Sequence, residues 1–94
     1  MTRMALLANV PSPEQQLVVT TMIQANGASW WHWFPTAWLI NDPLHHDLAF
    51  WTHALRRASP QFVFLLIDLD DPSRPPIGYM RSEWYEWIHQ HWSQ

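Results

Sequence analysis

The chain has no cysteine, few charged residues and no long apolar run. Without cysteine it can form neither disulfides nor thiolate metal sites, and it has no cysteine nucleophile. The absence of cysteine is compatible with both oxidising and reducing compartments, so it does not indicate where the protein resides. Met1–Met4 lead only into a brief apolar run with an Asn and two Pro behind it, so we expect neither a signal peptide nor a membrane span. We therefore expect a cytoplasmic protein.

Basic residues are also scarce. Five Arg, with no Lys, stand against eight acidic residues and give a formal net charge of −3. A protein that coats nucleic acid neutralises phosphates with basic side chains, so this balance disfavours such a role. Hydrophobic residues make up 48% of the chain and charged residues 14%, which excludes a disordered chain. The length of 94 residues suits one domain over 1–94.

The apolar pattern predicts six main elements. Strands are expected over 4–10, 29–34, 37–41 and 61–69, and helices over about 13–26 and 42–58. Ser12 and Pro13 form the start signal of the first helix, and Asp42 and Pro43 repeat that signal before the second. Between the second and third strands, Pro35 marks the turn of a hairpin.

The end of the chain adds a loop and a helix. Residues 70–76 are too rich in proline for regular structure, and a helix is expected over about 82–92. The order strand, helix, strand, strand, helix, strand predicts an α+β fold, the ferredoxin-like β-α-β-β-α-β sandwich, with an additional C-terminal helix. Its core would span about 3–70, with one antiparallel sheet backed by two helices.

The segment 30–40, Trp-Trp-His-Trp-Phe-Pro-Thr-Ala-Trp-Leu-Ile, resembles the SinR-like branch of the ferredoxin-fold proteins related to the CRISPR-associated adaptation endoribonucleases. The likeness continues through 62–68 and from Gly78 to the Trp-Ile pair at 87–88. It implies a homodimer. In members that cut nucleic acid it also implies an aspartate at the end of the first strand, paired across the dimer around a divalent metal. The matching residue here is Asn9, whose neutral oxygen is a poor substitute for a Mg²⁺-binding carboxylate.

The resemblance and the charge balance together favour a non-enzymatic homodimer that interacts with protein partners. A metal-dependent endoribonuclease is the alternative, with Asn9, Asp68 and His32 as its catalytic residues and Mg²⁺ as its cofactor. A third possibility is nucleic-acid binding without cleavage, in which Arg56 and Arg57, the only adjacent basic residues, would take part. No cofactor is expected outside the endoribonuclease alternative.

Two groups of polar residues have both a chemical and a structural interpretation. Asp68, Asp70 and Asp71 close the last core strand and could hold metal ions, but the adjacent Pro72 favours a turn in which aspartates accept backbone hydrogen bonds. His32 could act as a general base, although a hydrogen-bonded strand histidine is the interpretation we favour. None of the six histidines has an i,i+4 histidine partner, so we expect no dedicated histidine metal site.

Eight tryptophans are the outstanding feature of the composition. Trp38, Trp51 and Trp87 fall on predicted core faces. Alternation along the second strand places the side chains at 31 and 33 on one face, and those at 30, 32 and 34 on the other. Trp30, Trp84 and Trp92 are then left without a single-chain core, and we expect them at the interface of a two-fold dimer, close to the 70–76 loop and the C-terminal helix.

Overall fold

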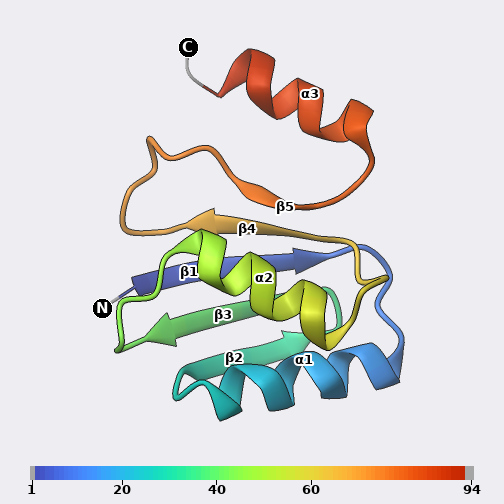
Figure 1. Ribbon diagram of the computed structural model, residues 1–94, viewed down its shortest axis with the longest axis vertical. Helices are drawn as coiled ribbons and strands as arrows, with labels where there is room; N and C mark the ends of the chain where they lie inside the picture. Colours follow the sequence, from blue (N-terminus) through green and yellow to red (C-terminus); the bar gives the residue numbers. More distant parts are fainter. Residues whose placement is uncertain (1, 93–94) are drawn as a thin grey trace.

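The computed structural model describes residues 2–92, which form an α+β fold with a five-stranded antiparallel sheet and three helices (Figure 1). The elements are β1 (Thr2–Ala8), α1 (Pro13–Ala25), β2 (Ser29–Phe34), β3 (Ala37–Asp42), α2 (Leu48–Ala58), β4 (Phe64–Asp68), β5 (Ile77–Tyr79) and α3 (Ser82–His91). The strand order is β2-β3-β1-β4-β5, with β1 hydrogen-bonded to both β3 and β4. The predicted α+β class is confirmed, and this order is compatible with a ferredoxin-like arrangement.

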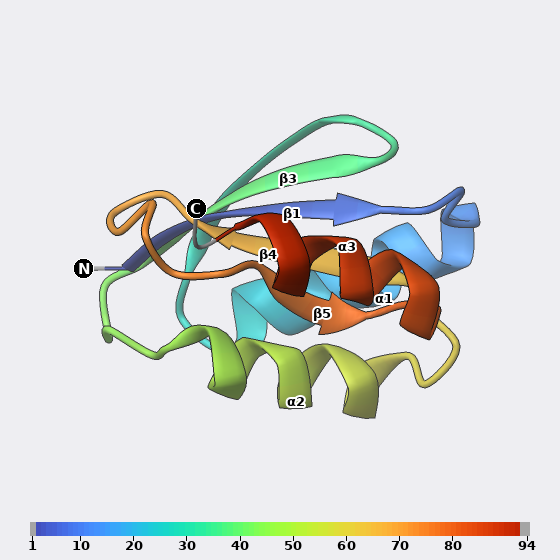
Figure 2. The ribbon, with the colours of Figure 1, turned by 90° about the horizontal axis from the view of Figure 1, so that it is seen from above.

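The helices are distributed unevenly around the sheet. Helices α1 and α2 lie side by side over one face, while α3 lies beyond the β5 edge (Figures 1 and 2). Neither view shows a helix over the opposite face. Within residues 2–92, none of the helices combines the length and the apolar character needed to cross a membrane.

The core lies between the sheet and the two covering helices. Alternate residues of the three central strands point into it, and they are Met4, Leu6, Trp38, Ile40, Phe64 and Leu66. The helices contribute Val19, Ile23, Leu48, Trp51 and Leu55. Trp38 and Trp51 are fully buried, which confirms their predicted core positions. The core position predicted for Trp87 is wrong, because its neighbour Ile88 is the residue of α3 that is buried and Trp87 is 59% exposed.

The first helix begins where its sequence signal predicts. Ser12 Oγ accepts a hydrogen bond from the backbone N–H of Gln15 at 3.1 Å, and Gln15 Oε1 accepts one from the N–H of Ser12 at 2.9 Å. This reciprocal capping satisfies two N–H groups that the first turn leaves without helical partners.

The predicted start of α2 at Asp42 and Pro43 is wrong. Strand β3 continues to Asp42, and α2 begins at Leu48 behind the N-cap Asp47, whose side chain accepts from the N–H of Phe50 at 2.8 Å. An aspartate followed by proline suits a turn as well as a helix start, because both use the carboxylate to accept backbone N–H groups. The two uses differ in tertiary contacts, which the local sequence does not encode.

The carboxylate of Asp42 is fully buried and connects β3 to α2. It accepts hydrogen bonds from the N–H of Leu44 at 2.9 Å and the N–H of His46 at 3.1 Å. It also accepts from Nδ1 of His46 at 2.9 Å and from Nε1 of Trp51 at 3.0 Å. Burial raises the pKa of Asp42, but these hydrogen bonds together hold it below the ordinary value.

Strand β5 was not predicted, because three residues are too few to show a period. It pairs with β4, and Gly78 lies opposite Leu65. A Cβ at Gly78 would overlap with the carbonyl oxygen of Phe64, so β5 reaches the sheet only with glycine at this position.

We predict that Gly78→Ala lowers the free energy of unfolding by about 1–3 kcal/mol, the usual cost of forcing atoms into a packed site. Chemical denaturation monitored by tryptophan fluorescence measures the change. Gly27→Ala is the comparison, since its added Cβ would meet only Leu44 at ordinary contact distance and its cost comes from a φ of +80°, about 1 kcal/mol. An unchanged stability for Gly78→Ala would contradict the close approach of β5.

We predict that Asp42→Asn lowers the free energy of unfolding by about 2–4 kcal/mol, because the amide removes the buried charge and replaces one of the two accepting oxygens with a donor. The matched control, Asp47→Asn, exchanges one good N-cap for another and should cost at most a few tenths of a kcal/mol. Because the pKa of Asp42 is lowered from 3.8, its stabilisation is complete above that value and is lost as the pH falls through the folded pKa. Denaturation between pH 7 and pH 3 should therefore show a smaller loss in Asp42→Asn than in the wild type.

Candidate interaction surface

The sheet face opposite α1 and α2, called here the open face, is apolar across four strands. Its apolar residues are Ala5, Leu7, Trp31, Phe34, Leu39, Leu65, Ile67 and Leu69. Side chains directly opposite each other in an antiparallel pair share a face. Ala5 of β1 lies opposite Leu39 of β3 and opposite Ile67 of β4, so all three side chains share this face. Leu7, Leu39 and Leu69 are 42%, 48% and 50% exposed, so much of the open face has no cover within residues 2–92.

A β-bulge in β2 places two aromatic side chains, Trp31 and Phe34, together on the open face. The register of β2 with β3 shifts between Trp31 and Phe34, so Phe34 lies opposite Ala37. The rings of Trp31 and Phe34 meet edge to face, with centroids 5.1 Å apart. The predicted alternation is therefore wrong for Phe34, because the extra residue of a bulge returns the next side chain to the same face. Trp33, inside the bulge, is 79% exposed.

The three tryptophans predicted at the interface lie in different places. Trp30 is opposite the core residue Ile40, at the β2 edge and on the helix side of the sheet. Trp84 lies on α3 beyond the β5 edge, and it lines a cavity of about 310 Å³ together with Leu7 and Leu65. Trp92 follows α3 and is partly buried. Trp30 and Trp84 are exposed as expected, but one chain does not bring the three together, since β2 and β5 are opposite edges of the sheet.

One buried polar atom on the open face has no hydrogen-bond partner. The side-chain oxygen of Asn41 is buried, and no donor within residues 2–92 reaches it. Asn41 lines a second cavity, of about 360 Å³, together with Trp31, Leu39 and Leu69. A buried acceptor without a partner costs about 1–3 kcal/mol, which a donor from a bound molecule would recover.

The residues of the endoribonuclease alternative are also separated. Asn9 follows β1, whereas Asp68 lies opposite Met4 at the other end of that strand, about 16 Å away at the rise of a β-strand. His32 lies on the helix side, with its ring stacked 3.9 Å from that of Trp38. The structure shows it as a hydrogen-bonded strand histidine, with Nδ1 2.9 Å from the carbonyl oxygen of Ala37.

The three aspartates after β4 are occupied by their own loop. Asp68 Oδ1 accepts from the N–H groups of Asp70 and Asp71 at 2.8 and 3.1 Å. The backbone N–H and the guanidinium of Arg3 bind Asp70 and lower its pKa, while hydrogen bonds from Ser73 lower the pKa of Asp71. This is the turn role that the neighbouring proline favours. In the part of the chain that the structure describes, no three histidine or acidic side chains are grouped as metal ligands.

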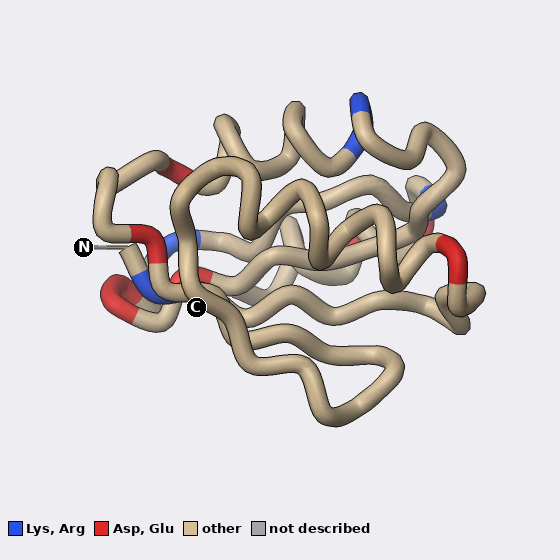
Figure 3. Tube along the Cα trace, turned by 90° about the horizontal axis from the view of Figure 1, so that it is seen from below, with Lys and Arg blue, Asp and Glu red and all other residues tan. Residues whose placement is uncertain are grey.

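The arginines are dispersed (Figure 3). Arg3, Arg74 and Arg81 form ion pairs with carboxylates at 2.7, 3.5 and 2.6 Å. Arg56 and Arg57 are adjacent in sequence but diverge around α2. The guanidinium of Arg56 lies 4.3 Å above the Tyr79 ring, while Arg57 faces α1. Within one chain they do not form the joint basic patch that base stacking would need.

Comparison with family models, with curated proteins and with solved structures finds no match. Within this chain's own geometry, the open face combines apolar side chains with substantial exposure. Strand alternation could have indicated that the leucines of the open face are exposed. The strands are apolar on both faces, and only two helices are available to cover them.

We predict that the purified protein does not degrade single-stranded RNA or double-stranded DNA with Mg²⁺ or Mn²⁺ at neutral pH, because Asn9, Asp68 and His32 lie apart. Gel assays of labelled substrates measure the cleavage. Asp68→Ala and Asn9→Ala are the diagnostic variants, since cleavage that either of them abolishes would contradict the non-enzymatic assignment.

Proposed function

We propose that the protein is a cytoplasmic, non-enzymatic homodimer of ferredoxin-like fold, and that the open face of one copy packs against the open face of a second. The observation that carries the proposal is the apolar, uncovered open face itself. Soluble monomers rarely leave a contiguous apolar patch larger than a few hundred Å². Association would remove it from water.

Charge and size favour a second copy of the chain as the partner that covers the open face. The only charged side chain in the open-face register is Arg3, which is paired with Asp70 of its own chain at 2.7 Å. Face-to-face packing around a two-fold axis therefore brings no unpaired charges together. The molecule measures 35 × 28 × 23 Å, so a sheet face is large enough for the roughly 800 Å² per partner of a stable interface.

Two further features support this arrangement. The buried oxygen of Asn41 needs a donor, and the exposed indole of Trp33 on a second copy carries a group of the right kind. Helix α3, with Trp84 and Trp87 exposed, lies at the edge of the open face, where a second copy would cover it.

The relation to the SinR-like branch forms part of the same proposal, because its members are generally homodimers and the order β2-β3-β1-β4 suits their fold. The endoribonuclease alternative has no comparable support, since its catalytic candidates are distributed over both ends and both faces of the sheet.

We predict that light scattering at micromolar concentration gives about twice the 11.2 kDa mass of one chain. Leu39→Glu, which places a charge in the middle of the open face, should weaken the dimer on the order of 100-fold or more, because a buried unpaired charge costs several kcal/mol. The matched control is Leu17→Glu on α1, where the side chain is 69% exposed on the helix side, and it should remain dimeric.

A wild-type monomer at this concentration would refute the proposal. Equal dissociation by Leu17→Glu and Leu39→Glu would show that the wrong face was chosen. A dimer that survives Leu39→Glu but dissociates with Trp84→Ala would place the interface on α3 instead.

A further inference from the structure

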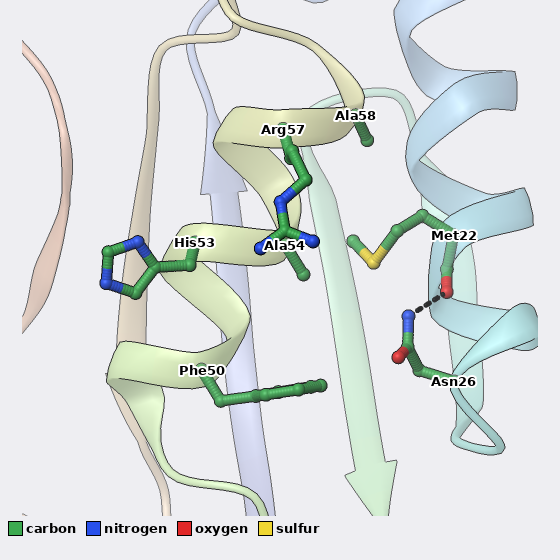
Figure 4. Close-up of a pocket in the computed structure, with 7 residues that line it drawn as sticks. All are labelled: Met22, Asn26, Phe50, His53, Ala54, Arg57 and Ala58. Carbon is green, nitrogen blue, oxygen red and sulfur yellow. Dashed lines mark hydrogen bonds between the residues drawn. The ribbon is translucent and has the colours of Figure 1, made fainter.

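The outer side of the helix layer contains a groove between α1 and α2 that has no part in the proposed dimer (Figure 4). Its volume is about 360 Å³, within the range of small-molecule sites. The groove is lined by Met22, Asn26, Phe50, His53, Ala54, Arg57 and Ala58. It therefore combines an apolar floor with a few polar groups, which is the usual composition of a ligand site.

Arg57 is the charged group of the groove, and it has no ion pair or hydrogen bond within residues 2–92. The other four arginines are occupied, three by carboxylates and Arg56 by the ring of Tyr79. Figure 4 shows the Arg57 side chain running along α2, with its guanidinium beside Ala54 and the thioether of Met22 on the opposite side of the groove. In a chain of net charge −3, an unpaired arginine above an apolar floor is available to an external anion.

No carboxylate competes for this position. Helix α2 has no acidic residue, and the one acidic residue of α1, Glu14, lies in its first turn. The groove is formed instead by the later turns of α1, around Met22 and Asn26. An anion would therefore meet no negative side chain there.

Phe50 gives the groove a fixed aromatic surface. One face of its ring is stacked on His46, with centroids 3.8 Å apart and planes 14° from parallel. His46 is held in turn by the buried carboxylate of Asp42 at 2.9 Å. Figure 4 shows the ring directed from α2 toward Asn26. Asn26 donates through Nδ2 to the carbonyl oxygen of Met22 at 2.9 Å, which leaves Oδ1 as an acceptor.

We propose that this groove binds a small organic carboxylate with an aromatic body. The planar guanidinium of Arg57 matches a carboxylate in a bidentate arrangement, and the aromatic body would pack on Phe50 and the polarizable sulfur of Met22. A phosphate ester fits less well, because it carries nearly two charges at neutral pH and the groove offers one permanent cation. The site is independent of the dimer and lies on the opposite side of the sheet.

The test is a titration with benzoate, followed by amide chemical shifts of the ¹⁵N-labelled full chain at pH 7. Saturable shifts are expected in 22–26 and 50–58. Arg57→Gln should weaken binding at least tenfold. The matched control, Arg56→Gln, removes the same charge from the next residue of α2 and should leave the affinity within about twofold, because a charge-assisted contact is worth about a factor of ten or more and its long-range part is screened.

Two chemical controls separate the parts of the site. Benzamide keeps the ring without the charge, acetate keeps the charge with almost no apolar body, and each should bind at least tenfold more weakly than benzoate. The proposal is overturned if Arg57→Gln binds benzoate as the wild type does, if benzamide equals benzoate, or if the shifts map to the open face. Leu39→Glu should bind benzoate unchanged, so failure of this site and failure of the dimer are distinguishable.

Discussion

Two helices can cover only one face of this sheet, and most of the molecule's properties depend on that constraint. Because α1 and α2 both lie on the same side, the even-numbered residues of β1 enter a closed core and the odd-numbered ones face outward. The outward residues are nevertheless apolar, among them Leu7 and Leu39. A strand that is apolar on both faces is typical of a sheet covered on both sides. No element within residues 2–92 covers this face fully, which is the physical basis of the proposed dimer.

Asp42 links the fold to the groove on the helix layer. Its buried carboxylate fixes the turn between β3 and α2, and through His46 it supports the ring of Phe50. A fully buried carboxylate persists only where hydrogen bonds replace its hydration, and four donors do so here. The same interaction therefore stabilises the core through Trp51 and orients the aromatic surface of the proposed site.

The polar residues divide into those that the fold already uses and those that it leaves free. Asp68 and its neighbouring aspartates are occupied by their loop, and His32 by a backbone carbonyl and by Trp38. Among the groups left without a partner in the part of the chain that the structure describes are the buried side-chain oxygen of Asn41 on the open face and the guanidinium of Arg57 above the groove. Unsatisfied polar groups mark places where binding can gain free energy, and these two lie on opposite sides of the molecule.

Local sequence patterns were enough to predict the α+β class, the first helix with its Ser12 capping box, the hairpin turn at Pro35 and the burial of Trp38 and Trp51. These features depend on neighbouring residues, through caps, turn chemistry and periodicity. Other features became visible only in the folded chain. Asp42 ends β3 and accepts a hydrogen bond from Trp51, while α2 begins only at Leu48, behind the N-cap Asp47. The pairing of β5 depends on the close approach of Gly78 to β4. The side of the sheet on which Phe34 lies depends on a β-bulge opposite β3. The different surroundings of Arg56 and Arg57 depend on the elements that pack around α2, since Arg56 meets Tyr79 of β5. Each of these is set by how separate elements meet in three dimensions, and the pattern of neighbouring residues carries no information about which element arrives.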